Sequence, residues 1–317
     1  MDKKVTVALD NTGDFNTIKA AYDSIKENEK ATIFVKNGAY FEKLIFEKPN
    51  ITLKGEDREK TIIRYNDCAL RRNEEYEQLN TFLTATLKIS STAENFKMEN
   101  ITVENCAGYG KIVGQAVALF VDVDKAIIEN CKIIGYQDTL LNAPYFLDLE
   151  NNHNIVKRQY FKNCYIEGDV DFIFGGAVVI FDKCEIYSKK RPEGYNGFIT
   201  AACTDKEREF GYVFMNCELT GDAKENTVYL GRPWRHYANV AFLNCKMGKH
   251  INQQHYCLWR EDDPDNRRET CHNAEYNNFG ENYSCDKAAE WVKVLTDKEA
   301  EKYNIKNIFD GWVPEGE

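Results

Sequence analysis

Two aspartates stand in apolar segments beside turn-forming glycines, a costly setting for a charged side chain. Asp138 lies in residues 135–141, and Asp171 lies 33 positions later, in residues 168–180. A buried carboxylate is unfavourable unless it is paired or used in chemistry. Two carboxyls held close together resist ionising at the same pH, so one can keep a proton while the other attacks as an anion. Either aspartate alone could equally be a turn or cap residue, so a catalytic pair requires a fold that brings the two together.

A permanently charged partner for one of these carboxyls is available in the segment Leu230-Gly231-Arg232-Pro233-Trp234. The guanidinium of Arg232 is a planar fork that can hold a carboxylate through two hydrogen bonds, although a surface ion pair near a turn is the plainer interpretation. The indole of Trp234 offers a flat apolar face that packs well on a sugar ring, and it would be equally ordinary as a core residue. We take both as candidate site residues.

The elements that must position these residues are indicated by a repeat over residues 31–285. Its copies are separated by 25, 33, 20, 33 and 28 residues and show no helical periodicity. Such a repeat predicts a solenoid with several short strands per coil, which is a parallel β-helix. We expect its Cys and Phe to stack inside as buried apolar residues and its Asn to form a ladder at a bend. The copies are Val103-Glu104-Asn105-Cys106, Ile128-Glu129-Asn130-Cys131, Phe161-Lys162-Asn163-Cys164, Phe181-Asp182-Lys183-Cys184, Phe214-Met215-Asn216-Cys217 and Phe242-Leu243-Asn244-Cys245.

A coiled architecture brings distant residues side by side. Residues at matching places on successive coils project from one face, and adjacent strands lie about 4.8 Å apart. Gln115, Asp138 and Asp171 are one coil apart if the second coil carries a loop, for which the polar segment 142–159 with Pro144 is the candidate. The sequence therefore predicts that the two aspartates lie next to each other, about 5 Å apart.

Both ends of the chain are predicted to add helices to a single domain of residues 1–317. Residues 15, 18, 22 and 25 are apolar at helical spacing after a possible cap at Asn16, and a helix there would cover the open end of the solenoid. Residues 286–317 are predicted to form a helical tail, with Ala288, Trp291, Val292 and Leu295 on its apolar face and no visible chemistry. No linker rich in Pro, Gly or Ser divides the chain.

Composition excludes several kinds of partner. The formal net charge of −10 argues against nucleic acid and anionic membranes, and no apolar run approaches the ~18 residues of a membrane span. The 11 cysteines contain no Cys-x-x-Cys pair and only 5 His accompany them, so we expect no metal site. So many unpaired thiols favour a reducing compartment, which predicts a cytoplasmic protein. The alternative is a secreted protein whose signal peptide has been removed.

The sequence resembles the pectin methylesterase (pectinesterase) family, whose members are carbohydrate esterases with a right-handed parallel β-helix. The matching segments are residues 80–86, 115–119, 135–140, 171–175 and 230–234, so the resemblance covers nearly the whole chain. It implies Asp171 as the nucleophile and Asp138 as the general acid and base. It also implies Gln115 and Gln137 as stabilisers of the oxyanion, Arg232 as a catalytic and substrate-binding residue, and Thr81, Tyr136, Phe174 and Trp234 as further substrate contacts.

The resemblance implies a monomeric enzyme that hydrolyses C6 methyl esters of galacturonic acid units in methyl-esterified polygalacturonate or oligogalacturonides, releases methanol and uses no cofactor. A glycoside hydrolase is the first alternative, because carboxyls about 5 Å apart also suit retaining glycosidases; two glutamines beside them suit a tetrahedral oxyanion better. A calcium-dependent lyase would require clustered metal-binding carboxylates, which the sequence lacks. A sugar-binding solenoid without catalysis is the remaining alternative. Asp171 could also activate water instead of attacking the ester itself.

Overall fold

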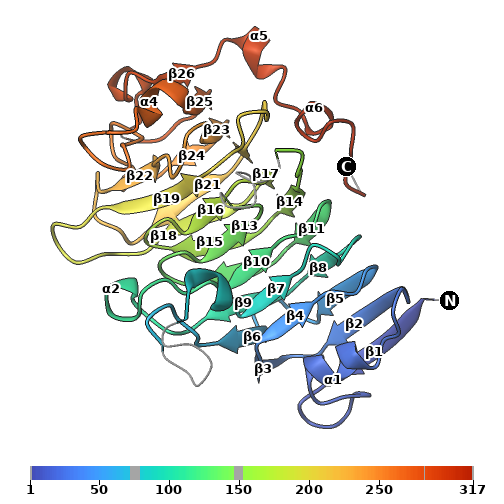
Figure 1. Cartoon of the computed structure of the whole chain (residues 1–317). Coiled ribbons are helices and arrows are strands. Elements are labelled where there is room, and N and C mark those ends of the chain that lie inside the picture. The colour runs from blue at the N-terminus through green and yellow to red at the C-terminus, as the bar shows by residue number, and fades with distance from the viewer. Residues whose placement is uncertain (1, 72–78, 146–152, 282, 316–317) are drawn as a thin grey trace.

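The computed structural model describes residues 2–71, 79–145, 153–281 and 283–315. Its strands wind into a coil that rises from the N-terminus to the C-terminus and stack into three sheets of 11, 8 and 7 strands (Figure 1). Every pairing between the named strands is parallel; for example, Val5 of β1 pairs with Ile33 of β2. The expected parallel β-helix is therefore confirmed.

Each sheet collects one strand from each successive coil. The first sheet contains β1 (Lys3–Val7), β2 (Ala31–Val35), β5 (Ile51–Gly55), β8 (Lys97–Glu99), β11 (Ala126–Glu129), β14 (Arg158–Lys162), β17 (Val178–Asp182), β20 (Tyr212–Met215), β23 (Asn239–Leu243), β25 (His272–Tyr276) and β26 (Val292–Val294). The second contains β3 (Gly38–Phe41), β6 (Thr61–Tyr65), β9 (Thr102–Asn105), β12 (Lys132–Ile134), β15 (Tyr165–Gly168), β18 (Glu185–Ser188), β21 (Glu218–Gly221) and β24 (Lys246–Met247). The third contains β4 (Leu44–Phe46), β7 (Leu87–Ile89), β10 (Leu119–Val121), β13 (Leu140–Asn142), β16 (Ile173–Gly175), β19 (Gly197–Ala202) and β22 (Val228–Gly231).

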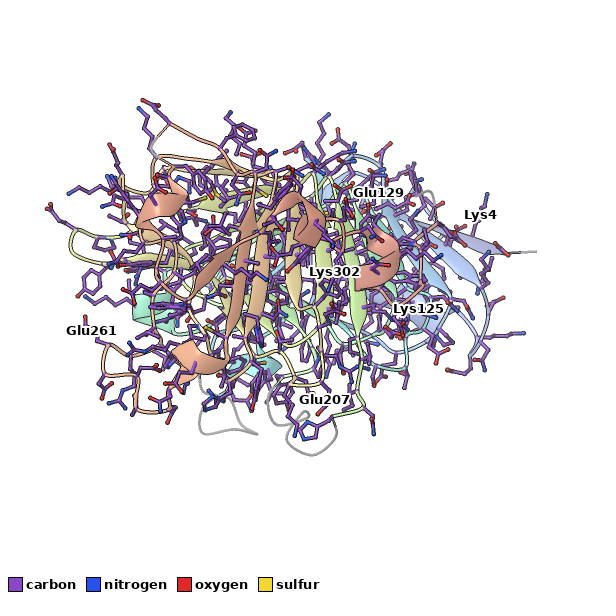
Figure 2. The ribbon with its side chains drawn as sticks, turned by 90° about the horizontal axis from the view of Figure 1, so that it is seen from above. Lys4, Lys125, Glu129, Glu207, Glu261 and Lys302 are labelled. Carbon is purple, nitrogen blue, oxygen red and sulfur yellow. The ribbon has the colours of Figure 1, made fainter. Side chains whose placement is uncertain are left out.

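The interior of the coil is built from the repeated apolar residues. The rings of Phe161, Phe181, Phe214 and Phe242 follow one another at 5.1, 4.5 and 4.2 Å between centroids. The repeat cysteines from Cys131 to Cys245 are at most 2% exposed, and all eleven cysteines of the chain are free thiols. Charged side chains, Lys4, Glu207 and Glu261 among them, project from the periphery (Figure 2). The predicted Cys and Phe stacks are confirmed.

The asparagine ladder lies at the turn that follows the first sheet. Its members all have left-handed φ values of +49° to +57°, which Asn adopts at lower cost than most residues. Side-chain amides join two of the neighbouring pairs of rungs, with 2.7 Å from Asn130 to Asn100 and 2.9 Å from Asn277 to Asn244. The rungs are Asn100, Asn130, Asn163, Lys183, Asn216, Asn244 and Asn277.

The first copy assigned to the repeat is out of register. Val103 pairs with Ile133 of β12, so residues 103–106 belong to the second sheet and its following turn. The residue one coil before Asn130 is Asn100, because Glu129 pairs with Glu99. The prediction that Asn105 and Cys106 begin the ladder is therefore wrong. The error arises because the dipeptide Asn-Cys recurs at a different place on the coil.

The N-terminal helix is shorter than expected. Helix α1 (Ile18–Asp23) lies against β1 and β2 at the N-terminal end of the coil (Figure 1). Its cap is Thr17, whose side chain accepts a hydrogen bond from the backbone of Ala20 at 3.2 Å, and not Asn16. Ile18 is fully buried in the core. Further short helices in the described part of the chain are α2 (Gly110–Val113), η1 (Thr81–Leu83), α4 (Arg267–Thr270) and η2 (Cys285–Lys287).

The C-terminal tail differs from the prediction. Residues 288–295 do not form a helix, since β26 adds a strand to the first sheet and pairs with β25. The alternation Val292-Lys293-Val294 has the period of a strand, and it competes with the helical spacing of Trp291, Val292 and Leu295. Within the residues described up to 315, this strand is followed by the one-turn helices α5 (Asp297–Ala300) and α6 (Ile305–Ile308). No helix in the described ranges is long and apolar enough to cross a membrane.

Candidate active site

Asp138 and Asp171 occupy equivalent turns on successive coils of the third sheet. Each precedes its strand by two residues, and the strands β13 and β16 pair with Leu140 opposite Ile173. The backbone N–H of Asp138 donates to the carbonyl of Val170 at 3.0 Å. Both aspartates have left-handed backbones, with φ of +64° and +48°. The register thus brings the two predicted residues to adjacent rungs, about one strand spacing of 4.8 Å apart. The candidate loop between them includes residues 146–152, which lie outside the described residues.

Arg232 reaches Asp171 from the end of β22, two strands further along the third sheet. Its Nε donates to Oδ1 of Asp171 at 2.9 Å, and its Nη2 donates to Oδ2 at 2.6 Å. The two side chains are only 20% and 8% exposed, so the pair is largely shielded from water. Two parallel charge-assisted hydrogen bonds fix both the position and the charge of the carboxylate. The two-hydrogen-bond contact expected of Arg232 with a carboxylate is therefore present, and its partner is Asp171.

Two aromatic rings hold the guanidinium of Arg232 in turn. Its central carbon lies 4.0 Å from the ring centroid of Phe198 and 4.3 Å from that of Trp259. Phe198 itself stacks on Tyr229 of β22 with an interplanar angle of 10°. Cation–π contacts of this kind are stronger when the site is desolvated. Neither Phe198 nor Trp259 was predicted, because nothing in their sequence neighbourhoods indicates that the aromatic of the preceding coil and that of a later segment both meet Arg232.

The surroundings of the two carboxyls shift their pKa values by different amounts. Burial raises the pKa of Asp138 well above its ordinary value, and the negative charge of Asp171 adds to that rise. Burial also raises the pKa of Asp171, but the hydrogen bonds and charge of Arg232 oppose the shift. As the pH falls, Asp138 therefore takes up a proton before Asp171 does. The site holds one neutral acid beside one carboxylate over the intervening pH range.

Two amide side chains accompany the carboxyls. Gln137 directly precedes Asp138, and the backbone N–H of Ala116 donates to the Gln137 carbonyl at 3.1 Å, which places Gln115 on the adjoining coil. Both glutamines are partly exposed. Gly110 of α2 packs tightly on Gln137, since a Cβ added there would lie 2.6 Å from both its Cβ and its Oε1. The close approach of a glycine thus holds this amide in place.

The remaining predicted contacts lie around an aromatic cluster. Trp234 is partly exposed and packs, with Trp259, on buried residues that include Phe174. The rings of Phe174 and Trp234 meet edge to face at 5.9 Å. Phe174 is only 3% exposed and supports Trp234 from the buried side, and its role as a substrate contact stays a prediction. Thr81 is partly exposed in η1, where its carbonyl caps Thr84.

Two basic side chains lie near Tyr136 and Asp169. The ammonium of Lys189 lies 3.9 Å from the centroid of the Tyr136 ring, and Arg191 forms an ion pair with Asp169 at 3.5 Å. Asp169 is 2% exposed, and burial raises its pKa although Arg191 and Lys189 oppose the shift. The structure thus adds a third carboxyl and two cations that the sequence analysis did not single out.

This arrangement suits acyl transfer. An ionised carboxylate held by a fixed cation can attack a carbonyl carbon, a neighbouring neutral carboxyl can protonate a leaving group, and nearby amide N–H groups can stabilise a negative oxygen. Among the described residues, no group of three or more His, Cys, Asp or Glu is placed to hold a metal ion.

Comparisons with known proteins point to one family. Residues 4–312 match the sequence pattern of the family described as Pectinesterase. The chain is 33% identical to Pectinesterase 31 of Arabidopsis thaliana, over 97% of this chain and 92% of that protein. The fold is similar to that of the pectin methylesterase from carrot, with a TM-score of 0.83 and 29% identity over 97% of this chain and 93% of that one. It is equally similar to a pectin methylesterase crystallised in complex with a hexasaccharide, with a TM-score of 0.83 and 25% identity over 99% of both chains. The chain spans about half the length, 48% to 57%, of the first curated relatives that it matches.

Proposed function

Because this chain belongs to the pectinesterase family, we propose that it hydrolyses the C6 methyl esters of galacturonic acid units in pectin or pectic oligosaccharides and releases methanol. The observation that carries the proposal is the two-armed hydrogen bonding of Arg232 to Asp171, beside the partly exposed Asp138 whose pKa is raised well above its ordinary value. A similar pectin methylesterase binds a hexasaccharide, which supports a sugar-chain substrate. Monomeric state, a single domain and cytoplasmic location stay predictions from the sequence.

In the first step, a carboxylate oxygen of Asp171 attacks the C6 carbonyl carbon of the ester. The tetrahedral intermediate collapses when the bond from carbon to the methoxy oxygen breaks, and protonated Asp138 gives its proton to that oxygen, so methanol leaves. The product is an anhydride between Asp171 and the galacturonate, beside an ionised Asp138. Arg232 keeps Asp171 anionic before the attack and orients it throughout.

In the second step, water regenerates the enzyme. Asp138, now ionised, takes a proton from a water molecule as its oxygen attacks the anhydride carbonyl, and Asp171 leaves as a carboxylate. The released galacturonic acid loses its proton to solvent. In both steps the negative carbonyl oxygen is stabilised by the amide N–H groups of Gln115 and Gln137, and each donor of this kind contributes roughly a hundred- to a thousandfold in rate.

The proposal is tested by methanol release from methyl-esterified polygalacturonate, with reducing ends measured in the same samples. We expect methanol without new reducing ends, and at least a thousandfold loss in Asp171→Ala. New reducing ends would instead favour a glycoside hydrolase. Rapid-quench measurement of a single turnover separates the two forms of the mechanism, because only the anhydride route can release methanol before the free galacturonic acid forms.

A further inference from the structure

A histidine and a glutamate form a buried pair on the last coils of the molecule. Nδ1 of His255 donates to Oε1 of Glu275 at 2.8 Å, and each side chain is only 1% exposed. Glu275 belongs to β25, and its Oε2 accepts hydrogen bonds from the hydroxyl of Tyr283 at 2.7 Å and from Nδ2 of Asn278 at 3.2 Å. The rings of His255 and Tyr283 stack at 4.9 Å. Burial of two ionisable groups is costly, and the mechanism above uses neither of them.

The pair holds a tight turn in a fixed place. The backbone of His255 is left-handed, with φ of +59°, a conformation that is uncommon for residues other than glycine. Its N–H donates to the carbonyl of Asn252 at 2.9 Å and closes the turn. Because the side chain of His255 is anchored on Glu275 in the interior, the hydrogen bond between them fixes the course of residues 252–259.

This turn is bonded directly to the strand that leads to Arg232. The N–H of Leu230 donates to the carbonyl of His255 at 2.7 Å, and the N–H of Cys257 donates to the carbonyl of Gly231 at 3.3 Å. These two bonds flank the peptide groups immediately before Arg232. The backbone from which the guanidinium extends is therefore positioned by the segment that His255 anchors.

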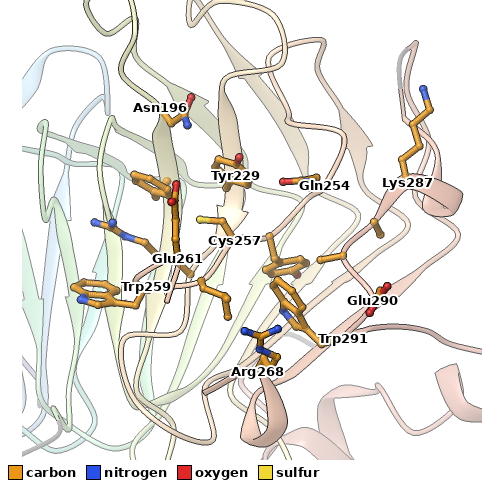
Figure 3. A pocket seen from close by; sticks show the side chains of 16 residues that line it. Asn196, Tyr229, Gln254, Cys257, Trp259, Glu261, Arg268, Lys287, Glu290 and Trp291 are labelled. Carbon is orange, nitrogen blue, oxygen red and sulfur yellow. The ribbon is translucent and has the colours of Figure 1, made fainter. Parts of the chain in front are cut away.

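The same segment carries one of the two rings that contact the guanidinium. Trp259 follows His255 by four residues and lines, together with Arg232, a cavity of about 790 Å³ (Figure 3). Its ring centroid lies 4.3 Å from the central guanidinium carbon. The other ring, that of Phe198, belongs to β19 and lies outside this segment. Loss of the buried pair is thus expected to loosen Arg232 from one side only.

We propose that His255 and Glu275 are positioning residues for the reaction: their buried hydrogen bond holds residues 252–259 so that Arg232 binds both carboxylate oxygens of Asp171. Both side chains are enclosed in the interior, so neither touches a bound sugar and their effect passes through Arg232. The inference rests on the proposed function and adds to it the residues that keep the Arg232 contact in register.

The test compares two substitutions of His255 by methanol release over a range of pH. His255→Gly accepts the left-handed backbone but removes the contact with Glu275, whereas His255→Asn also accepts that backbone and keeps an N–H donor at the δ position. We expect His255→Gly to lower kcat/KM about three- to tenfold. The acidic limb of its rate profile should move to higher pH, because a looser Arg232 opposes the rise in the pKa of Asp171 less. His255→Asn should restore most of both properties.

A matched control separates positioning from a general loss of stability. Phe46→Leu trims a fully buried ring near the N-terminal end of the coil, and thermal melting measures the stability of every variant. This control should leave the acidic limb unchanged. Tyr283→Phe is a milder change that removes only the hydroxyl bonded to Glu275, and it should move the limb in the same direction as His255→Gly by a smaller amount, so the test stands even if the glycine variant does not fold.

Two results would overturn the inference. One is an acidic limb that stays in place in His255→Gly, or in Tyr283→Phe if the glycine variant does not fold. The other is an Asn variant as impaired as the Gly variant, since the hydrogen bond to Glu275 would then have no part in the effect. Failure of the proposed function looks different, because the wild-type enzyme would then release no methanol at any pH.

Discussion

Replacement of Arg232 by Lys keeps the positive charge but removes the fork that holds Asp171. The guanidinium makes two hydrogen bonds to the carboxylate at 2.9 and 2.6 Å and is enclosed by two aromatic rings. A lysine ammonium is a compact point charge that cannot reproduce the two parallel contacts. The substitution therefore isolates the geometry of the pair from its net charge.

The expected loss of activity corresponds to one of the two hydrogen bonds between Arg232 and Asp171. A hydrogen bond to a charged group contributes roughly 1.5–3 kcal/mol, which corresponds to a roughly ten- to hundredfold loss in kcat/KM. The pH dependence should change too. Arg232 opposes the burial that raises the pKa of Asp171, so weaker contact lets this pKa rise further. Because Asp171 reacts as the anion, the acidic limb of the rate profile moves to higher pH.

The assay is methanol release over a range of pH, with an equivalent substitution elsewhere as the control. Arg158 holds Asp124 by the same two-armed geometry, at 3.0 and 2.5 Å, on the first sheet and away from the site. Arg158→Lys should cost stability without moving the acidic limb. If Arg232→Lys lowers the rate but leaves that limb where it was, Arg232 acts on the substrate alone and the reasoning is refuted.

Four further predictions follow from the same structure. Asp138→Asn should lower kcat by roughly a hundredfold or more. Because burial raises the pKa of Asp138 in the folded state, ionisation of Asp138 destabilises the fold as the pH rises. The Asn variant should therefore resist urea better than wild type at pH 7 but not at pH 3. Gly110→Ala should displace the amide of Gln137 and lower kcat by up to roughly a hundredfold, with KM little changed in steady-state assays. Trp259→Ala should lower kcat/KM by roughly three- to thirtyfold and shift the acidic limb upward, while Trp259→Phe restores most of the loss. Phe181→Ala should lower the free energy of unfolding by about 3–5 kcal/mol in urea titrations, because it empties one position of the internal stack.

The coil and the carboxylate pair could be predicted because they are periodic features. A residue type that recurs once per coil, such as the buried Phe or the left-handed Asn, reports the fold without any knowledge of loop lengths. The same period places Asp138 beside Asp171, since both stand two residues before a strand of one sheet. The out-of-register copy at residues 103–106 shows the limit, because a dipeptide alone does not identify the sheet on which it lies.

The parts that could not be predicted depend on contacts between coils of unequal length. Phe198 and Trp259 enclose Arg232 from different segments, and no spacing in the sequence marks either as its neighbour. The tail was predicted to be helical because the spacing of its apolar residues fits both a helix and a strand. In the structure, part of it pairs with β25 as the strand β26. Trp291, which directly precedes this strand, lines a cavity together with Arg232.

The central claim is that Asp138 keeps its proton at a pH where Asp171 has lost its own. Infrared difference spectroscopy between wild type and each single Asn variant, with ¹³C-labelled aspartate, measures this directly. At neutral pH the account predicts a protonated-carboxyl band that disappears in Asp138→Asn, and a carboxylate band that disappears in Asp171→Asn. A protonated band that belongs to Asp171, or two carboxylate bands and no protonated one, would contradict it.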